Sequence, residues 1–218
     1  MAQESTLVIK AFQVNPLGVN CYVVSDATGE ACIIDPGCMN GIEWSNIHEY
    51  IESNQLRPRH LLCTHLHFDH ILGCGYPYRD YGLSLEASIN DKDLYDNLDG
   101  CLARFGLPPH TTPALPPLTP IGESDIITFG THSFTVIETP GHSRGGLCFY
   151  CKEEDLLFSG DTLFFGSIGR SDFPESSYDD IIHSITQRLL TLPPETNVLC
   201  GHGGSTSIGY ESRYNPYL

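Results

Sequence analysis

The segment Thr64-His65-Leu66-His67-Phe68-Asp69-His70 holds the densest group of ligand-type side chains in this 218-residue sequence. Three histidines and an aspartate within six positions are typical of metal binding, because imidazole is a common metal ligand and a carboxylate adds compensating charge. In an extended or loop conformation, His65 and His67 project to the same side. Asp69 and His70 can then turn toward a second ion about 3.5 to 4 Å away. We therefore expect this one segment to serve two metals.

The sequence before this segment predicts strands and one helix. Residues 60–64 are a short apolar run that is typical of a buried strand, and this run leads directly into the histidine segment. Further upstream, short runs bounded by turn residues predict strands at 7–14, 19–25 and 31–34, arranged as an antiparallel meander. Residues 26–29 are the turn before the third strand, and Asp35-Pro36-Gly37 ends that strand. Apolar residues near helical period predict an amphipathic helix around 42–51 that ends before Arg57-Pro58.

The sequence after the segment contains a second group of strands. We expect a hairpin at 125–139 around Gly130 and strands at 146–151, 156–159 and 197–200. A proline-rich connection at 108–120 and a helix at 176–190 separate these elements. A further amphipathic helix is predicted at 90–105, with Asp91 and Asp93 in its first turn and a stripe formed by Leu94, Leu98, Leu102 and Phe105. Two strand groups with accompanying helices predict an α/β fold in which two sheets pack face to face, as a single domain spanning 1–218.

Three more potential ligands follow or precede glycine at a predicted strand end. They stand in Thr139-Pro140-Gly141-His142, in Ser159-Gly160-Asp161 and in Gly201-His202-Gly203. Glycine allows the backbone to approach a metal closely. A lone histidine in such a place is more often a hydrogen-bonded loop residue, but four such clusters in one chain favour a metal site.

Composition restricts the partners and the compartment. Hydrophobic residues make up 40% and charged residues 17%, so the chain has ample material for a core. The net charge of -16 repels phosphate backbones and anionic lipids, so we expect no nucleic-acid and no membrane partner. The opening residues 1–12 show no basic stretch followed by an apolar run, which favours a cytoplasmic location. The nine cysteines are expected to be reduced and mostly buried, with Cys148 and Cys151 facing opposite ways on one strand.

The histidine segment, with His142, Asp161 and His202 downstream in order, resembles the metallo-β-lactamase superfamily, whose fold is an αββα four-layer sandwich. This resemblance covers essentially the whole chain. Within the superfamily, residues 20–22, 160–164, 169–173 and 201–203 are similar to the glyoxalase II (hydroxyacylglutathione hydrolase) branch. The short form of that branch, which lacks a C-terminal helical domain, is the most similar.

The resemblance implies a dinuclear centre with two divalent metal ions. One ion would be held by His65, His67 and His142, and the other by Asp69, His70 and His202. Asp161 and a hydroxide would bridge them, and Asp69 would also orient the hydroxide, so both aspartates are catalytic candidates. Zinc is the first expectation, and iron and manganese accept the same donors.

The resemblance also implies the reaction, which is hydrolysis of S-acylglutathione-type thioesters by the metal-bridging hydroxide without a serine or cysteine nucleophile. Arg170, followed by Arg144 and then Arg213, is the candidate for binding the substrate carboxylates. A structural ion pair of Arg170 with Asp172 is the alternative. Two departures favour a different or less selective acyl donor. The chain ends at 218 without the helical domain that in full-length glyoxalase II contributes much of the glutathione-binding surface, and residues 143–145 replace the usual Thr-Pro-Gly after His142. In addition, Asp172 stands where full-length glyoxalase II tends to have a tyrosine that contacts glutathione.

Other functions stay open at this stage. A persulfide dioxygenase of the same fold would hold one iron with His65, His142 and Asp161. A non-catalytic structural metal protein is a further alternative, although structural sites are usually closed and rich in thiolates. A lactonase or a phosphodiesterase of the same fold is a further alternative. β-Lactam hydrolysis is less favoured, because zinc-dependent β-lactamases typically carry cysteine at the position of Asp161. The sequence makes no prediction of the oligomeric state.

Overall fold

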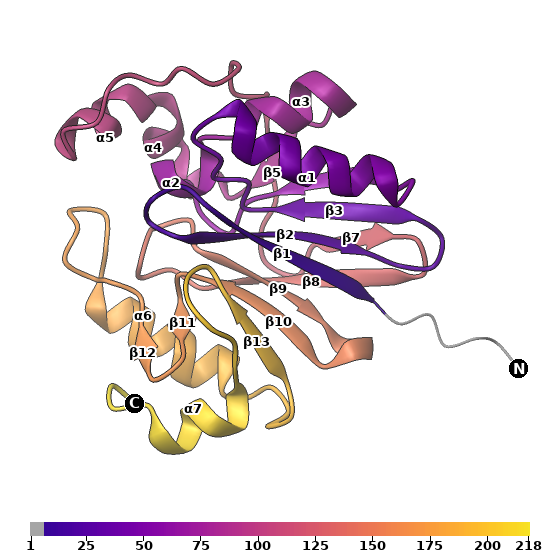
Figure 1. Cartoon of the computed structure of the whole chain (residues 1–218). Coiled ribbons are helices and arrows are strands. Elements are labelled where there is room, and N and C mark those ends of the chain that lie inside the picture. Colours follow the sequence, from indigo (N-terminus) through magenta and orange to yellow (C-terminus); the bar gives the residue numbers. More distant parts are fainter. Residues whose placement is uncertain (1–6) are drawn as a thin grey trace, which may run out of the picture.

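The computed structural model describes residues 7–218, and its strands form two six-stranded sheets that pack face to face (Figure 1). The first sheet follows chain order and consists of β1 (Val8–Val14), β2 (Val19–Ser25), β3 (Glu30–Ile34), β4 (Arg57–Leu62), β5 (Leu85–Ala87) and β6 (Leu118–Pro120). The second sheet consists, in spatial order, of β14 (Thr206–Ser207), β13 (Asn197–Cys200), β10 (Leu156–Gly160), β9 (Leu147–Cys151), β8 (His132–Glu138) and β7 (Ile126–Phe129). A small hairpin of β11 (Leu163–Phe164) and β12 (Ser167–Ile168) lies beside it.

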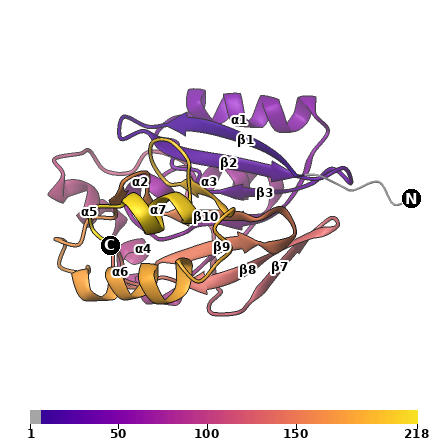
Figure 2. The ribbon, with the colours of Figure 1, turned by 90° about the horizontal axis from the view of Figure 1, so that it is seen from below.

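Helices cover the outer face of each sheet. Above the first sheet lie α1 (Gly41–Ser53) and α3 (Gly75–Tyr81), as Figure 1 shows. Below the second sheet lie α6 (Tyr178–Ser184), which continues as a π-helical turn at Ile185–Leu189, and α7 (Ile208–Tyr214). Figure 2 shows the resulting order of helix, sheet, sheet and helix. The predicted αββα four-layer sandwich is therefore confirmed.

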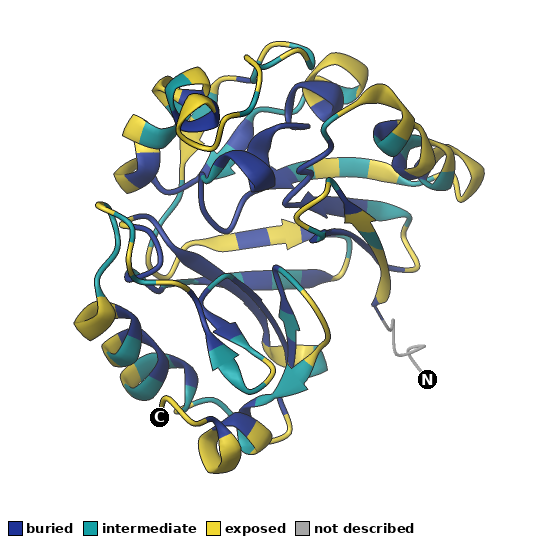
Figure 3. Ribbon diagram, turned by 60° about the vertical axis from the view of Figure 1, so that its left-hand side comes forward, coloured by how far each residue is buried: buried dark blue, intermediate teal, exposed yellow. Residues whose placement is uncertain are grey.

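Strand alternation divides the apolar residues among the layers. Val23 of β2 packs in the cluster under α1, whereas the next residue, Val24, packs in the cluster between the sheets. Helix α1 is capped by Asn40, whose side chain accepts hydrogen bonds from the backbone of residues 42 and 43, and it buries Trp44 and Ile47 against the first sheet. Figure 3 shows buried residues between the sheets and exposed residues on the outer helix faces.

Most predicted strands are confirmed. β1, β2 and β3 pair antiparallel as a meander, and β7 and β8 form the expected hairpin. In β9, Cys148 packs toward α6 while Cys151 packs between the sheets, so the two thiols face opposite ways. All nine cysteines are buried, which confirms the predicted burial of the thiols, and none of them is paired in a disulfide within residues 7–218.

The continuous helix predicted at 90–105 is wrong. The structure has a 3-10 turn at Ile89–Asp91, then α4 (Lys92–Asp96) and α5 (Leu98–Arg104). The break occurs because Asn97 leaves the helical region, with φ of -115° and ψ of 37°. The proline-rich connection also contains a strand, since β6 pairs parallel with β5 at the edge of the sheet, where Pro120 is tolerated.

The predictions of no membrane partner and of no export leader are only partly addressed by the structure. Within residues 7–218, no helix has both the length and the apolar character that crossing a bilayer requires. The predicted absence of an export leader concerns a segment whose residues 1–6 lie outside the described part of the chain.

Candidate metal centre

The seven side chains that the sequence singled out lie together, and they come from both sheets. β4 leads into the segment of His65 and His67, and the short helix α2 (Phe68–Ile71) carries Asp69 and His70. The other three follow strands of the second sheet: His142 after β8, Asp161 after β10 and His202 after β13. Because the strand ends of the two sheets meet at one end of the sandwich, side chains as distant in sequence as Asp69 and His202, 133 positions apart, are neighbours.

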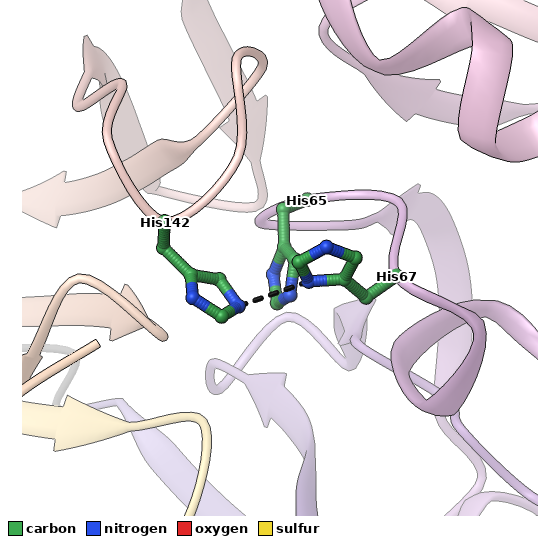
Figure 4. Close-up of side chains that lie close together, drawn as sticks. All are labelled: His65, His67 and His142. Atoms are coloured by element: carbon green, nitrogen blue, oxygen red, sulfur yellow. Dashed lines mark hydrogen bonds between the residues drawn. The ribbon is translucent and has the colours of Figure 1, made fainter. Parts of the chain in front are cut away.

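Three histidines form the first group. The ligand atoms of His65, His67 and His142 all lie within 4.8 Å of one another. Figure 4 shows the three rings facing one another, with Nδ1 of His67 2.9 Å from Nε2 of His142. Such a set of converging imidazole nitrogens can hold one divalent cation.

The second group combines two histidines with a carboxylate. The ligand atoms of Asp69, His70 and His202 also lie within 4.8 Å of one another. Nε2 of His70 is 3.4 Å from Nε2 of His202, which in turn lies 3.5 Å from Oδ2 of Asp69. This group can hold a second cation beside the first.

Asp161 lies between the two groups. Its Oδ2 is 3.6 Å from Nε2 of His142 and 3.4 Å from Nε2 of His202, one residue from each group. Its Oδ1 is 3.5 Å from Nε2 of His70. A carboxylate in this position can contact both cations at once.

Three features of the described residues fit a metal in this place. Nε2 of His65 and Oδ1 of Asp161 are buried without a hydrogen-bond partner, which is costly unless another group satisfies them. The donors are imidazole and carboxylate only, a set that zinc, iron and manganese all accept. A Cβ atom on Gly201 would lie 2.2 Å from Oδ1 of Asp161, so this position has no room for a side chain.

The cluster is electrostatically suited to a cation. Burial lowers the pKa of His65, and the neighbouring His70 lowers it further, so this ring is neutral, as a metal ligand must be. Burial also opposes charge on His202, but hydrogen bonds to Asp161 and Asp69 raise its pKa to about 10. The two carboxylates therefore attract positive charge at the centre of the cluster.

Backbone carbonyls fix the orientation of two rings. Because a carbonyl can only accept, Nδ1–H of His142 donates to the carbonyl of Arg170 at 2.9 Å, which leaves Nε2 free toward the cluster. Nδ1–H of His202 donates to the carbonyl of Leu17 at 3.1 Å in the same manner. The outer nitrogen of His67, Nε2, lies 3.3 Å from a carboxylate oxygen of Glu175.

Asp35 is a site residue that the sequence analysis missed. This carboxylate lies 3.1 Å from Nδ1 of His70 and accepts hydrogen bonds of 2.8 Å from both the backbone N–H and the hydroxyl of Thr64. Asp35 thus connects the end of β3 to the histidine segment. Its signal was present in Asp35-Pro36-Gly37, which was interpreted only as the end of a strand.

Asp91 is the second residue that was missed. Its carboxylate accepts hydrogen bonds from the backbone N–H of Leu66 at 3.1 Å, from the hydroxyl of Ser143 at 2.7 Å and from the backbone N–H of Gly145 at 2.6 Å. Burial raises the pKa of Asp91, and these hydrogen bonds oppose that rise. The sequence placed Asp91 in the first turn of a predicted helix, which gave no indication of this contact. In the structure, Asp91 joins the histidine segment to the loop that carries His142.

The cluster opens into a pocket of about 920 Å³. Arg170 lines this pocket, and its guanidinium also pairs with Asp172 through two hydrogen bonds of 2.9 Å. Arg144 is exposed and does not line the pocket, and neither does Arg213 on α7. Arg104 of α5, which the sequence analysis did not consider, lines the pocket.

The fold and this constellation define a class. The sequence model of the metallo-β-lactamase superfamily matches residues 14–202, and the chain belongs to that superfamily of metal-dependent hydrolases.

Similarity extends along the whole chain to individual proteins. The hydroxyacylglutathione hydrolase GloC of Haemophilus influenzae is 35% identical over 212 residues, which are 96% of this chain and 97% of GloC. The structure of TTHA1623 in a di-iron-bound form matches with a TM-score of 0.84 at 36% identity, covering 96% of this chain and 100% of that one. The structure of the BLEG-1 B3 metallo-β-lactamase matches with a TM-score of 0.86 at 33% identity, covering 97% of this chain and 99% of that one.

Proposed function

We propose that this protein is a dinuclear thioester hydrolase that acts on S-acylglutathione-type substrates. The observation that carries the proposal is the pair of three-residue donor groups around Asp161, at the base of an open pocket. The full-length similarity to a hydroxyacylglutathione hydrolase supports the thioester as the reacting bond. Residues 1–218 act as one domain in this proposal, because both sheets contribute to the same site.

Each donor group has a defined role in the proposal. His65, His67 and His142 would hold one cation, and Asp69, His70 and His202 would hold the other, with the carboxylate of Asp161 as a further ligand. Two divalent cations in such a site supply Lewis acidity toward the thioester carbonyl and lower the pKa of bound water. Zinc is the first expectation for the metal, and the di-iron form of TTHA1623 supports iron as the alternative.

The remaining chemistry belongs to this chain's own residues. Asp69 lines the pocket and can accept a hydrogen bond from the attacking water, which orients the water toward the substrate. Cys101 also lines the pocket, but burial raises the pKa of its thiol despite the nearby Arg104, so the thiol stays protonated and is a poor nucleophile. Arg170 is placed at the pocket to attract the carboxylates of the thiol moiety.

A structural metal site is disfavoured by the geometry. Such sites are closed, four-coordinate and usually rich in thiolates. The two donor groups and Asp161 contain no cysteine. Five of these seven side chains line the open pocket, namely His67, Asp69, His142, Asp161 and His202. A substrate can therefore reach the cluster.

The test is a substrate panel with purified protein of measured metal content. The panel holds S-lactoylglutathione and other acyl thioesters, a lactone, a β-lactam and glutathione persulfide with an oxygen electrode. We expect two metal ions per chain and the highest kcat/KM on a thioester. One iron per chain with rapid oxygen uptake on the persulfide would instead identify a dioxygenase. Protein with no bound cation after careful purification would contradict the metal assignment altogether.

A further inference from the structure

One side of the pocket is a continuous apolar wall, which we define as Phe68, Leu72, Leu94, Cys101, Phe105 and Leu107. The wall is built by α2, α4 and α5 and by the turn that follows α5. Phe68, Leu72 and Cys101 are buried, whereas Phe105 is 51% exposed at the end of the wall. The rings of Phe68 and Phe105 are in contact, with centroids 5.0 Å apart.

Two uncharged polar side chains, Asn15 and Ser167, line the pocket, and both make hydrogen bonds within the protein. The side-chain amide of Asn15 donates hydrogen bonds to the carbonyls of Gly37 and Asp69. Its amide oxygen accepts a hydrogen bond from the backbone N–H of Leu17. Ser167 belongs to the hairpin on the other side of the pocket. A hydroxyl placed against the apolar wall would therefore lose its hydrogen bonds to water without replacement.

The charged groups that line the pocket are those of the cluster, Glu175 and two arginines. The aspartates and histidines of the cluster form its base. Arg104 and Arg170 also line it, and no lysine does among residues 7–218. Arg170 packs over the ring of Phe173, 4.4 Å from its centroid, and this ring lies 6.4 Å from that of Phe105. The pocket therefore combines a reactive base, cationic groups and one long apolar surface.

We propose that the apolar wall binds the acyl chain of the substrate, and that this chain is a medium-length aliphatic one of about six to eight carbons rather than a short hydroxylated acyl group. This inference rests on the proposed function for the identity of the reacting bond. The half-exposed ring of Phe105 is the expected contact for the far end of the chain, because an acyl chain along the wall would cover it.

The kinetic test compares thioesters of one thiol with metal-loaded protein. S-acetyl-, S-butanoyl-, S-hexanoyl-, S-octanoyl- and S-lactoylglutathione differ only in the acyl group. We expect kcat/KM to rise roughly twofold to fourfold for each methylene from butanoyl to octanoyl, because each one buries apolar surface. The lactoyl thioester is expected to fall below the butanoyl one.

A binding test separates the pocket from the reaction. Butanoate, hexanoate and octanoate are titrated calorimetrically into the metal-loaded protein, with no bond broken. Phe105→Ala removes the half-exposed ring and is expected to weaken octanoate binding about eightfold, which corresponds to about 50 Å² of lost apolar contact. Phe165→Ala is the matched control, since Phe165 is 58% exposed and does not line the pocket, and this variant is expected to bind like the wild type.

The outcomes distinguish the two proposals. Thioester cleavage with no dependence on chain length would overturn the inference and leave the thioesterase proposal intact. Absence of thioester cleavage, together with carboxylate binding that tightens with length and is weakened by Phe105→Ala, would support the apolar wall as a chain-binding surface and contradict the thioesterase. Equal losses in Phe105→Ala and Phe165→Ala would also overturn the inference.

Discussion

Replacing Asp91 with asparagine tests how the two halves of the cluster are held together. Asp91 is 2% exposed, and its two oxygens accept three hydrogen bonds, from Leu66, Ser143 and Gly145. Asparagine offers one accepting oxygen, and its NH2 group must face at least one of the two backbone N–H donors. The hydroxyl of Ser143 can rotate to accept from that NH2 group, but a buried backbone donor then has no partner.

The expected magnitude follows from that count. One buried donor without a partner costs about 1–3 kcal/mol of unfolding free energy, so we expect Asp91→Asn to lose about 2 kcal/mol. For a chain of this size, that loss lowers Tm by about 4–8 °C. Because the donors belong to the segment between His65 and His67 and to the loop after His142, we also expect metal affinity to fall about tenfold.

The assay measures thermal unfolding of metal-free and metal-loaded protein, with chelator competition for metal affinity. Asp93→Asn is the matched control, because Asp93 is exposed on the same segment, and its Tm is expected to stay close to the wild-type value. Ser143→Ala removes a single donor and provides a milder perturbation of about 1 kcal/mol in case Asp91→Asn does not fold. Wild-type Tm and metal affinity in both Asp91→Asn and Ser143→Ala would refute the role of this carboxylate.

Three further predictions concern other parts of the chain. Asp161→Ala should lose bound metal and turnover together while circular dichroism stays unchanged, and full metal content by elemental analysis would contradict its central position. Gly141→Ala should lower the unfolding free energy by about 2–3 kcal/mol in urea titrations, because φ is 141° and a Cβ would meet the backbone of α6 at 2.3 Å; unchanged stability would refute that close approach. Burial raises the pKa of Asp26, but hydrogen bonds from Thr28 and Thr131 hold it well below its usual value of about 3.9. Its carboxylate therefore stabilises the fold above that pH, and this contribution is lost as the pH falls, so Asp26→Asn should be less sensitive than the wild type to acidification from pH 5 to 2; equal sensitivity would contradict this.

The parts of the fold that the sequence predicted are those with a local signal. Short runs bounded by turn residues located β1, β2 and β3, and the turn at 26–29 separated the second strand from the third. The sequence signal of the candidate cluster was equally local, because histidine and aspartate next to glycine at a predicted strand end can be recognised from residue type alone. Predicting that His65, His142 and His202 converge required neither the strand register nor the loop conformations. It required only two sheets whose strands end on the same side.

The parts that were missed depend on contacts between distant segments. Asp91 lies 25 residues from Leu66 and 52 from Ser143, and nothing near it in sequence shows that its carboxylate joins their loops. β5 and β6 have three residues each, which is too short for alternation to appear. They are strands because β4 offers β5 a parallel edge, and β5 then offers one to β6.

The apolar residues predicted at 94–105 show the same limit of sequence-based prediction at the pocket. On one continuous helix, Leu94, Leu98, Leu102 and Phe105 would share a face, and this pattern predicts that all four pack in the core. The break at Asn97 divides them, so that Leu98 and Leu102 are 6% and 2% exposed in the core while Leu94 and Phe105 line the pocket. An apolar side chain stabilises a core and a bound acyl chain through the same removal of surface from water, so residue type cannot separate the two roles. The metal-ligand residues can therefore be recognised in the sequence, whereas the apolar lining of the pocket depends on where a helix ends.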